Sequence, residues 1–265
     1  MSIKFLVVVP TLNSYHLLPK LTQSLQSQTF KDWRCLFIDG PSSKEHRQWL
    51  SHCCQTDRRF QWSEQMPQFK KIFGAMNQGF QDAKPEEWVL FWGSDDWAAS
   101  PTVLQTLAEA AITGKQNHRP NLVIAKGRYA NAKGQLTRVT AFSTKRHTSD
   151  LCVEGYRKKL FFGETPPHQA TLFGPKTHST QSLYRERFLL SADLDYFLRL
   201  ANNSELTARC VNLDLVHMSV GGVSRQQAKS RFSQVATIYK ESFKRLWWVP
   251  FISRYIRRLA SALKR

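Results

Sequence analysis

The sequence predicts an α/β protein whose mainly parallel central sheet is flanked by helices. Strand and helix patterns alternate at a spacing of roughly 25 to 30 residues through the first hundred residues, as in successive βα units. Three of the predicted strands end in polar or acidic loops. A basic amphipathic helical tail is predicted near the C-terminus, outside this sheet.

The strands of the first hundred residues are short apolar runs bounded by turn residues. They are predicted at Lys4–Val9, Arg34–Ile38, Phe60–Ser63 and Trp88–Trp92. β-branched and aromatic residues dominate these runs, as is typical of strands.

Helical periodicity fills the segments between the strands. The first helix is expected to be capped by Asn13 or Ser14. Its buried face is predicted to hold Leu17, Leu18, Leu21 and Leu25. Further helices are predicted at Lys44–Cys54, Ile72–Ala83 and Pro101–Ala111.

The pattern beyond residue 111 is weaker and supports fewer elements. Strands are predicted at Leu122–Ala125, Arg128–Ala130 and Leu206–Cys210, and a helix at Ala192–Ala201. Asn131–Gly134 is predicted as a hairpin turn, Phe161–Phe173 as a loop and Gly221–Gly222 as a flexible break.

Length and composition exclude several classes of protein. The chain has 265 residues, 42% of them hydrophobic, which is too apolar for a disordered chain. It contains no apolar run of about 18 residues, so no membrane-spanning helix is expected. The first residues predict a strand rather than a signal peptide, and the five cysteines lack paired spacing. A cytoplasmic protein with reduced thiols is expected.

The net charge of +18 is unevenly distributed along the chain. Residues 1–100 carry a net +1, residues 101–224 a net +7 and residues 225–265 a net +10. Within the last block, apolar residues recur at helical spacing: Trp248, Ile252, Ile256, Leu259 and Leu263. A basic, tryptophan-containing amphipathic helix is typical of a segment that lies on an anionic membrane. Packing of this stripe on the protein's own core and binding of nucleic acid are the alternatives.

The polar loops after three strands are candidate ligand-binding segments. They are Thr11–Asn13, Asp39–Ser43 and Ser94–Asp96. In an open parallel sheet, ligands bind where such loops leave the carboxyl ends of the strands. Neither a G-x-G-x-x-G nor a G-x-x-x-x-G-K-[ST] motif occurs, which argues against ordinary dinucleotide enzymes and P-loop NTPases.

Asp95 and Asp96 are consecutive carboxylates after a buried strand, where their charges repel unless a cation or hydrogen-bond donors compensate. Such a pair suits Mg²⁺ or Mn²⁺, which take oxygen ligands and share them with phosphates. The alternative is a pair of acidic residues at the start of a helix before Trp97.

The order of several short motifs resembles that of family 2 glycosyltransferases with the GT-A fold, a Rossmann-like sheet flanked by helices. The donor half carries VVVPTLN (7–13), SLQSQTFKDWRCLFIDGPS (24–42), SE (63–64), GAMNQGFQDA (74–83) and WVLFWGSDD (88–96). The later motifs are HQATLF (168–173), SADLDYFLRLA (191–201) and GGVS (221–224). The resemblance is to enzymes that build bacterial O-antigen, capsule and colanic acid polysaccharides.

This resemblance implies an inverting transfer of a sugar from a nucleotide-diphosphate donor with a divalent metal, Mn²⁺ or Mg²⁺. Pro10, Thr11, Asn13, Asp39 and Asn77 are then expected in the donor site. Asp95 is expected near the ribose or the metal, and Asp96 as a metal ligand. The metal would stabilise the negative charge on the departing diphosphate.

The resemblance also implies residues for the acceptor side. Asp193 is expected to be the general base that takes the proton of the acceptor hydroxyl, with Asp195 as its competitor. His168 and Gln169 are expected to line the donor-sugar or acceptor pocket. His217 is a candidate metal or phosphate ligand. Arg225 is expected either to contact the diphosphate or to begin the basic tail.

The segment between residues 64 and 77 departs from the subgroup's pattern. Gln65 and Phe73-Gly74 stand where acidic residues and a Gly-Ile-Tyr-Asp run are usual. Lys70 and Lys71 are predicted either to contact phosphate or to be solvated.

The sequence therefore predicts a glycosyltransferase that extends a glycan, with a lipid-linked acceptor, on the cytoplasmic face of a membrane. Residues 1–100 are expected to bind the donor, residues 101–224 to hold the acceptor and the base, and residues 225–265 to form the tail. Nucleic acid is not expected as a partner. A nucleotidyltransferase that makes nucleotide sugars and a basic nucleic-acid-binding module are the alternative functions.

Overall fold

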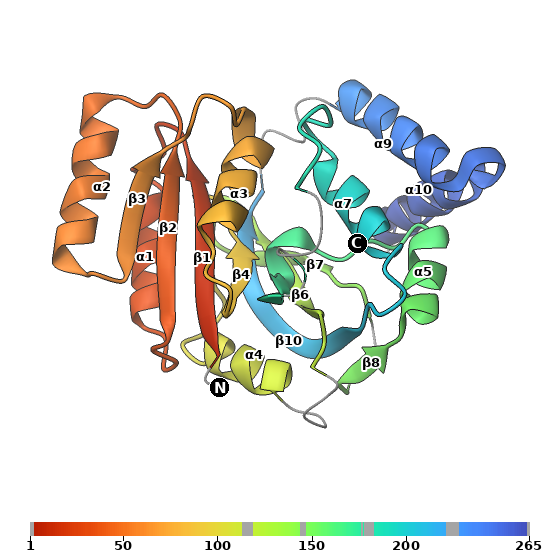
Figure 1. Ribbon diagram of the computed structural model, residues 1–265, viewed down its shortest axis with the longest axis horizontal. Coiled ribbons are helices and arrows are strands. Elements are labelled where there is room, and N and C mark those ends of the chain that lie inside the picture. Colours follow the sequence, from red (N-terminus) through yellow and green to blue (C-terminus); the bar gives the residue numbers. More distant parts are fainter. Residues whose placement is uncertain are drawn as a thin grey trace.

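The computed structural model describes residues 3–112, 119–143, 147–175, 177, 183–220 and 228–263. Within these residues, ten strands form one sheet, and helices lie on both of its faces (Figure 1). The main strand order is β3-β2-β1-β4-β9-β6-β10-β5, and β7 and β8 pair with β6 and β10. The predicted α/β class is confirmed.

The N-terminal part of the sheet is parallel, as predicted. Its strands are β1 (Lys4–Thr11), β2 (Trp33–Asp39), β3 (Phe60–Glu64) and β4 (Glu87–Phe91). The helices that connect and flank them are α1 (Leu18–Gln26), α2 (Lys44–Thr56), α3 (Lys71–Asp82) and α4 (Val103–Ile112). The register places Thr11 beside Asp39, so these two residues meet at the carboxyl ends of β1 and β2.

The C-terminal part of the sheet mixes parallel and antiparallel pairs. Its strands are β5 (Asp96–Ala98), β6 (Leu122–Ala130), β7 (Leu136–Thr140), β8 (Ser149–Leu151), β9 (Thr171–Phe173) and β10 (Ala208–Ser219). The α-helices are α5 (Val153–Phe161), α7 (Ala192–Leu200), α9 (Ala228–Phe243) and α10 (Trp248–Leu263). Two 3₁₀ turns, η1 (His168–Ala170) and η2 (Lys244–Leu246), complete the described elements.

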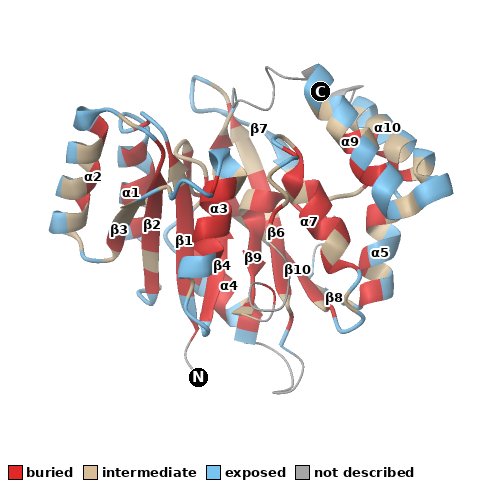
Figure 2. Cartoon of the chain, turned by 45° about the horizontal axis from the view of Figure 1, so that its top comes forward, coloured by how far each residue is buried: buried red, intermediate tan, exposed pale blue. Residues whose placement is uncertain are grey.

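The hydrophobic core has two layers, one on each face of the sheet. Successive residues of β1 alternate between them: Phe5, Val7 and Val9 face one layer, while Leu6 and Val8 face the other. Both layers bury the strands and the inner sides of the helices (Figure 2). The polar ends of the strands are therefore held by a scaffold that is packed on both sides.

Several predicted boundaries are wrong for local reasons. The first helix begins at Leu18 without a side-chain cap, with Pro19 in its first turn, where a missing N–H costs nothing. Leu17 precedes the helix and is exposed rather than buried. The strands predicted at Leu122–Ala125 and Arg128–Ala130 are one continuous strand, β6.

Other elements were absent from the sequence prediction. They are β5, β7, β8, β9 and α5, and β10 runs well past its predicted end at Cys210. The predicted loop at Phe161–Phe173 contains η1 and ends in β9. β10 contains register shifts between Cys210 and Val216, which break the simple alternation of apolar and polar residues. The hairpin turn at Asn131–Gly134 is present between β6 and β7.

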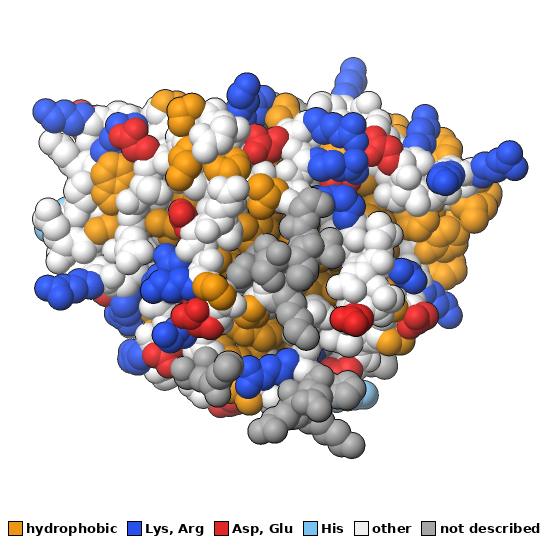
Figure 3. Space-filling model, viewed as in Figure 1, with side chains coloured by type: hydrophobic (Ala, Val, Ile, Leu, Met, Phe, Trp, Pro, Cys, Tyr) orange, Lys and Arg blue, Asp and Glu red, His pale blue; other side chains and the backbone are white. Residues whose placement is uncertain are grey.

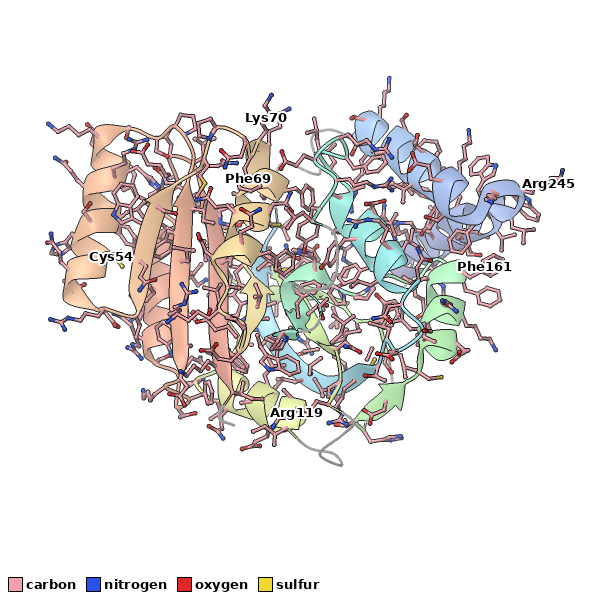
Figure 4. The ribbon with its side chains drawn as sticks, in the orientation of Figure 1. Cys54, Phe69, Lys70, Arg119, Phe161 and Arg245 are labelled. Atoms are coloured by element: carbon pink, nitrogen blue, oxygen red, sulfur yellow. The ribbon has the colours of Figure 1, made fainter. Side chains whose placement is uncertain are left out.

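The C-terminal tail is a pair of helices rather than one. α9 packs on α7, and α10 packs on α9 and α5. Figure 4 shows Phe161 at the end of α5 and Arg245 at the outer tip between α9 and α10. Among the described residues, we find no helix with the length and apolarity needed to cross a membrane.

Candidate active site

Asp39 is the centre of a polar cluster at the ends of β1 and β2. Its buried Oδ1 accepts hydrogen bonds from Thr11 Oγ1 at 3.0 Å and Ser42 Oγ at 2.6 Å. Its Oδ2 is buried without a hydrogen-bond donor among the residues described. The predicted pair of Thr11 and Asp39 therefore lies together, with one carboxylate oxygen able to accept a further bond.

Two residues from the first turn of α2 join this cluster, and the sequence analysis did not identify them. His46 Nε2 lies 3.0 Å from Asp39 Oδ1, and Arg47 Nε lies 3.4 Å from Asp39 Oδ2. Burial lowers the pKa of His46, and Asp39 opposes that shift. The sequence feature that could have identified them is the position of His46 and Arg47 in the first turn of the helix after the Asp39 loop.

Pro10 and Asn13 connect the loops of the candidate site. Asn13 has a positive φ of 49°, and its Oδ1 accepts from the Ser43 N–H at 2.7 Å. The Pro10 carbonyl accepts from Ser94 Oγ at 3.1 Å, which ties the loop after β1 to the loop after β4. In this structure both residues hold loops in place.

Asp95 and Asp96 follow β4 and Gly93. Asp96 is only 3% exposed, and its Oδ2 accepts from the Gly93 N–H at 2.6 Å. Burial, followed by the charge of Asp95, raises the pKa of Asp96 well above its ordinary value, and burial also raises the pKa of Asp95. Asp96 begins β5 rather than a helix, so the helix-start alternative for this pair is wrong.

The acidic pair fits a divalent cation, because two neighbouring carboxylates with raised pKa values lack a compensating positive charge. Hard cations of this kind commonly take one or two protein carboxylates and complete their shell with phosphate and water. No group of three or more acidic, histidine or cysteine side chains suited to a metal occurs in the described part of the chain. Metal binding by Asp95 and Asp96 therefore stays a prediction.

His217 is not brought together with this pair. In the antiparallel ladder, Met218 pairs with Asp96 and His217 pairs with Trp97. Paired residues share a face of the sheet, and successive residues alternate between its two faces. His217 and Trp97 therefore lie on the opposite face of the sheet from Asp96 and Met218. The His217 and Trp97 rings are 5.6 Å apart. The prediction that His217 completes a metal site with Asp96 is not supported by this geometry.

His168 is buried in an aromatic environment. Its Nε2 lies 2.8 Å from the Tyr184 hydroxyl, and its ring stacks on Phe91. Burial lowers the pKa of His168 to about 4, although the nearby Asp193 carboxylate opposes the shift. The imidazole is therefore neutral at physiological pH. Tyr184 is a second residue of this pocket that the sequence analysis did not identify.

Gln169 is placed by a backbone contact. The Trp92 indole N–H donates to the Gln169 carbonyl at 3.0 Å, which fixes the His168-Gln169 turn against the end of β4. The predicted pair therefore lies beside the strand that leads to Asp95 and Asp96.

The two candidate bases of α7 differ sharply in their surroundings. Asp195 is fully buried and forms ion pairs with Arg185 and, at 3.0 Å, with Arg199. Asp193, in the first turn of α7, is half-buried and close enough to His168 to affect its pKa. Asp195 has a structural role, whereas Asp193 is available for chemistry.

Asn77 positions another segment rather than pointing at a ligand. It is buried, and its amide nitrogen donates to the Tyr184 carbonyl and to Glu186 Oε1, at 3.0 and 3.1 Å. Its oxygen accepts from the Tyr184 N–H at 2.7 Å. Asn77 therefore supports the Tyr184 segment in this structure, and its contact with the donor stays a prediction.

The neighbouring loop and the region after β10 complete the predicted residues. Gln65 Nε2 donates to the Phe69 and Lys71 carbonyls, which shapes the loop before α3. The Lys70 side chain is exposed at the edge of the molecule (Figure 4). Arg225 and the Gly221–Gly222 break lie outside the described residues.

Comparison with known proteins identifies the class to which this fold and site belong. The model of the family described as glycosyl transferase family 2 matches residues 6–164, more than half of the chain. The chain belongs to this family and is a glycosyltransferase.

Individual relatives agree with this membership. A PGL/p-HBAD biosynthesis glycosyltransferase of Mycobacterium tuberculosis is 27% identical over 230 residues, which cover 86% of this chain and 82% of the relative. A GalNAc(5)-diNAcBac-PP-undecaprenol beta-1,3-glucosyltransferase of Campylobacter jejuni is 27% identical over 161 residues, 61% of this chain and 50% of the relative.

Solved structures confirm the GT-A fold. TarS 1–349 of S. aureus, in complex with UDP-GlcNAc, superposes with a TM-score of 0.67 at 17% identity, covering 90% of this chain and 66% of TarS 1–349. The mannosyltransferase PcManGT of Pyrobaculum calidifontis, with GDP-Man and Mn²⁺, gives 0.63 at 11% identity, covering 98% and 71%. The chain thus spans slightly less than two thirds of the TarS chain.

Proposed function

We propose that this enzyme transfers a sugar, with inversion, from a nucleotide-diphosphate sugar to a lipid-linked glycan acceptor. The observation that carries the proposal is the convergence of three strand ends: Thr11 of β1, Asp39 of β2 and the acidic pair after β4. The PcManGT and TarS structures, in complex with GDP-Man and UDP-GlcNAc, support a nucleotide-sugar donor. The Campylobacter relative, named for a PP-undecaprenol glycan, supports a lipid-linked acceptor.

The roles of the site residues follow from their surroundings. The buried Asp39 cluster would bind the nucleoside, since Oδ2 of Asp39 can accept one more hydrogen bond. A divalent cation bound by Asp95 and Asp96 would stabilise the negative charge on the departing diphosphate. The Mn²⁺ in neighbouring structures supports such a metal.

Asp193 would act as the general base on the acceptor side. It would take the proton from the acceptor hydroxyl as the oxygen attacks the anomeric carbon from the face opposite the diphosphate. Neutral His168, held by Tyr184, would line the sugar pocket as a hydrogen-bonding group without adding charge.

A thermal-shift screen across UDP-, GDP- and dTDP-sugars with Mn²⁺ tests the donor. A ligand that binds only the folded protein stabilises it and so raises its melting temperature. At a ligand concentration of one hundred times Kd, the free energy of unfolding increases by about 2.7 kcal/mol. We expect one nucleotide series to stabilise the protein in the presence of Mn²⁺. If no nucleotide sugar binds or is hydrolysed, and Asp96→Ala changes nothing, the proposed function is wrong.

We further propose that the enzyme works at the cytoplasmic face of a membrane, attached through α10. The stripe of Trp248, Ile252, Ile256 and Leu259 is 48% to 65% exposed, so the protein's own core does not cover it. Hydrophobic side chains gather over the tail, beside Lys and Arg side chains (Figure 3). Exposed apolar side chains bordered by cations suit an anionic bilayer.

Replacing Ile252 and Ile256 with Asp tests this attachment. The double variant is expected to lose flotation with phosphatidylglycerol liposomes, because it places two charges at the apolar interface. Its folding should be unchanged, since both side chains are exposed. Thr237→Asp on the exposed side of α9 is the matched control. If the double variant at Ile252 and Ile256 floats with the liposomes as the wild-type protein does, attachment by this stripe is contradicted.

A further inference from the structure

Four arginines, from β7, α9 and α10, lie close enough to affect one another electrostatically, and α9 packs on α10. They form what we call the arginine cluster: Arg138, Arg231, Arg254 and Arg258. Burial, followed by the charges of the other members, lowers the pKa of Arg258 to about 10. Burial and nearby like charges both disfavour the charged form of a guanidinium.

Two members of the arginine cluster have buried groups without partners. Arg254 is only 9% exposed, and its Nε has no hydrogen-bond acceptor among the described residues, although Nη1 donates to Thr165 Oγ1. Nε of Arg231 is likewise buried without an acceptor in that part of the chain. Burying a cation without a counter-charge is costly. Among the described residues, no carboxylate forms an ion pair with Arg231 or Arg254.

The chain's own carboxylates do not fill this role. All 20 acidic residues lie within the described ranges. Glu241, the acidic residue of α9, pairs with Arg185 and Arg187. Glu164 pairs with Lys159 at 2.8 Å and with Arg257 at 3.3 Å. The nearby acidic groups are thus engaged elsewhere.

The backbone at Arg254 packs closely against Gly163. Gly163 has a φ of +76°, and a Cβ there would lie 2.4 Å from the Arg254 backbone nitrogen. The loop before His168 and the backbone of α10 are therefore in direct contact, with no room for a side chain.

An apolar surface adjoins the arginine cluster. Phe232, Phe251 and Tyr255 form an aromatic wall, with the Phe232 ring 4.9 Å from Phe251 and 5.1 Å from Tyr255. Arg258 lies over the Tyr255 ring, 5.5 Å from its centroid. Phe232 is half exposed. The arginine cluster and an exposed aromatic surface thus lie side by side.

We propose that the arginine cluster binds the phosphate or diphosphate of a lipid-bearing ligand, with the first part of the apolar chain on the aromatic wall. Guanidinium groups match phosphate oxygens with paired N–H donors. A ligand with phosphate joined to hydrocarbon satisfies both surfaces at once. The choice of a lipid-bearing ligand rests on the proposed function, in which the acceptor is lipid-linked.

Binding of farnesyl diphosphate to the full chain tests this site. Titrations are made with a metal chelator and without donor nucleotide, with inorganic pyrophosphate and farnesol as separate probes. We expect farnesyl diphosphate to bind at least about tenfold more tightly than either probe. Equal binding of pyrophosphate would overturn the lipid assignment in favour of a free-anion site. Absence of farnesyl diphosphate binding would overturn the proposal.

Variants separate this site from the donor site. Arg231→Gln and Arg254→Gln are each expected to weaken farnesyl diphosphate binding by about tenfold. Arg231→Gln keeps the test decisive if the more buried Arg254→Gln folds poorly. Arg257→Gln, which removes an exposed arginine paired with Glu164, is the matched control and should bind normally.

Asp96→Asn should also bind farnesyl diphosphate normally. Loss of binding in this variant would show that the probe occupies the donor site and would overturn the proposal. Failure of the proposed function is seen separately, in the nucleotide-sugar screen with Mn²⁺.

Discussion

Replacing Asp193 with Asn is expected to lower the rate of sugar transfer by about 10²–10⁴-fold, the usual contribution of a general base. The amide keeps the size of the side chain but cannot take the proton of the acceptor hydroxyl. Because the interaction is made in the transition state, kcat and kcat/KM should fall together. The measurement is release of nucleoside diphosphate from the donor, with and without a lipid extract that supplies acceptors.

The structure provides a sharp control two residues away. Asp195→Asn removes the partner of two arginines at a fully buried position, and it is expected to destabilise the fold by about 3–5 kcal/mol. Asp193→Asn should cost at most about 1 kcal/mol, from the loss of a charge at the start of α7. Urea unfolding distinguishes the two. Unchanged transfer by a folded Asp193→Asn variant would exclude Asp193 as the base.

The parallel half of the fold could be predicted because its information is local. The strands from Lys4, Arg34, Phe60 and Trp88 are short runs bounded by turns. Those from Lys4, Arg34 and Trp88 are largely buried, whereas β3, at the end of the strand order, buries only Phe60. The same locality placed Thr11, Asp39 and the acidic pair at strand ends. Since parallel strands share an edge for their carboxyl ends, neighbouring loops must meet there.

What the sequence analysis missed depends on contacts between distant segments. β5 is three residues long and is defined by its pairing with β10, more than 100 residues later. That register decides which face His217 occupies. The structural role of Asp195 likewise depends on Arg185, which lies outside its helix.

The burial of the C-terminal tail could likewise not be predicted from local sequence. Helical periodicity grouped Trp248, Ile252 and Ile256 on one face, but it could not say whether that face meets the core or the solvent. The structure exposes it and turns Arg254 inward. The opposite arrangement would have been the ordinary one, because arginine is rarely buried unless it is paired. α10 therefore has an exposed apolar face and a buried arginine, the reverse of the usual arrangement.

Replacing Asp96 with Asn is expected to make the metal-free protein more stable and the enzyme nearly inactive. The raised pKa of folded Asp96 means that the folded state binds protons more readily than the unfolded state. Stability is therefore lost as pH rises from the ordinary carboxyl value towards this raised pKa. Asn removes that loss while its oxygen can still accept from the Gly93 N–H. A gain of about 0.5–2 kcal/mol is expected near pH 7, of the size seen when a strained active-site group is replaced.

The same variant should lose the stabilisation that Mn²⁺ and a nucleotide diphosphate give together, because one of two carboxylate ligands is gone. Urea unfolding with a chelator, and then with Mn²⁺ and UDP or GDP, measures both effects on one sample. Asp32→Asn, which changes an exposed carboxylate far from this pair in sequence, is the control and should respond to Mn²⁺ like the wild type. A variant that is less stable without metal, yet fully active with it, would show that Asp96 serves the fold rather than the reaction.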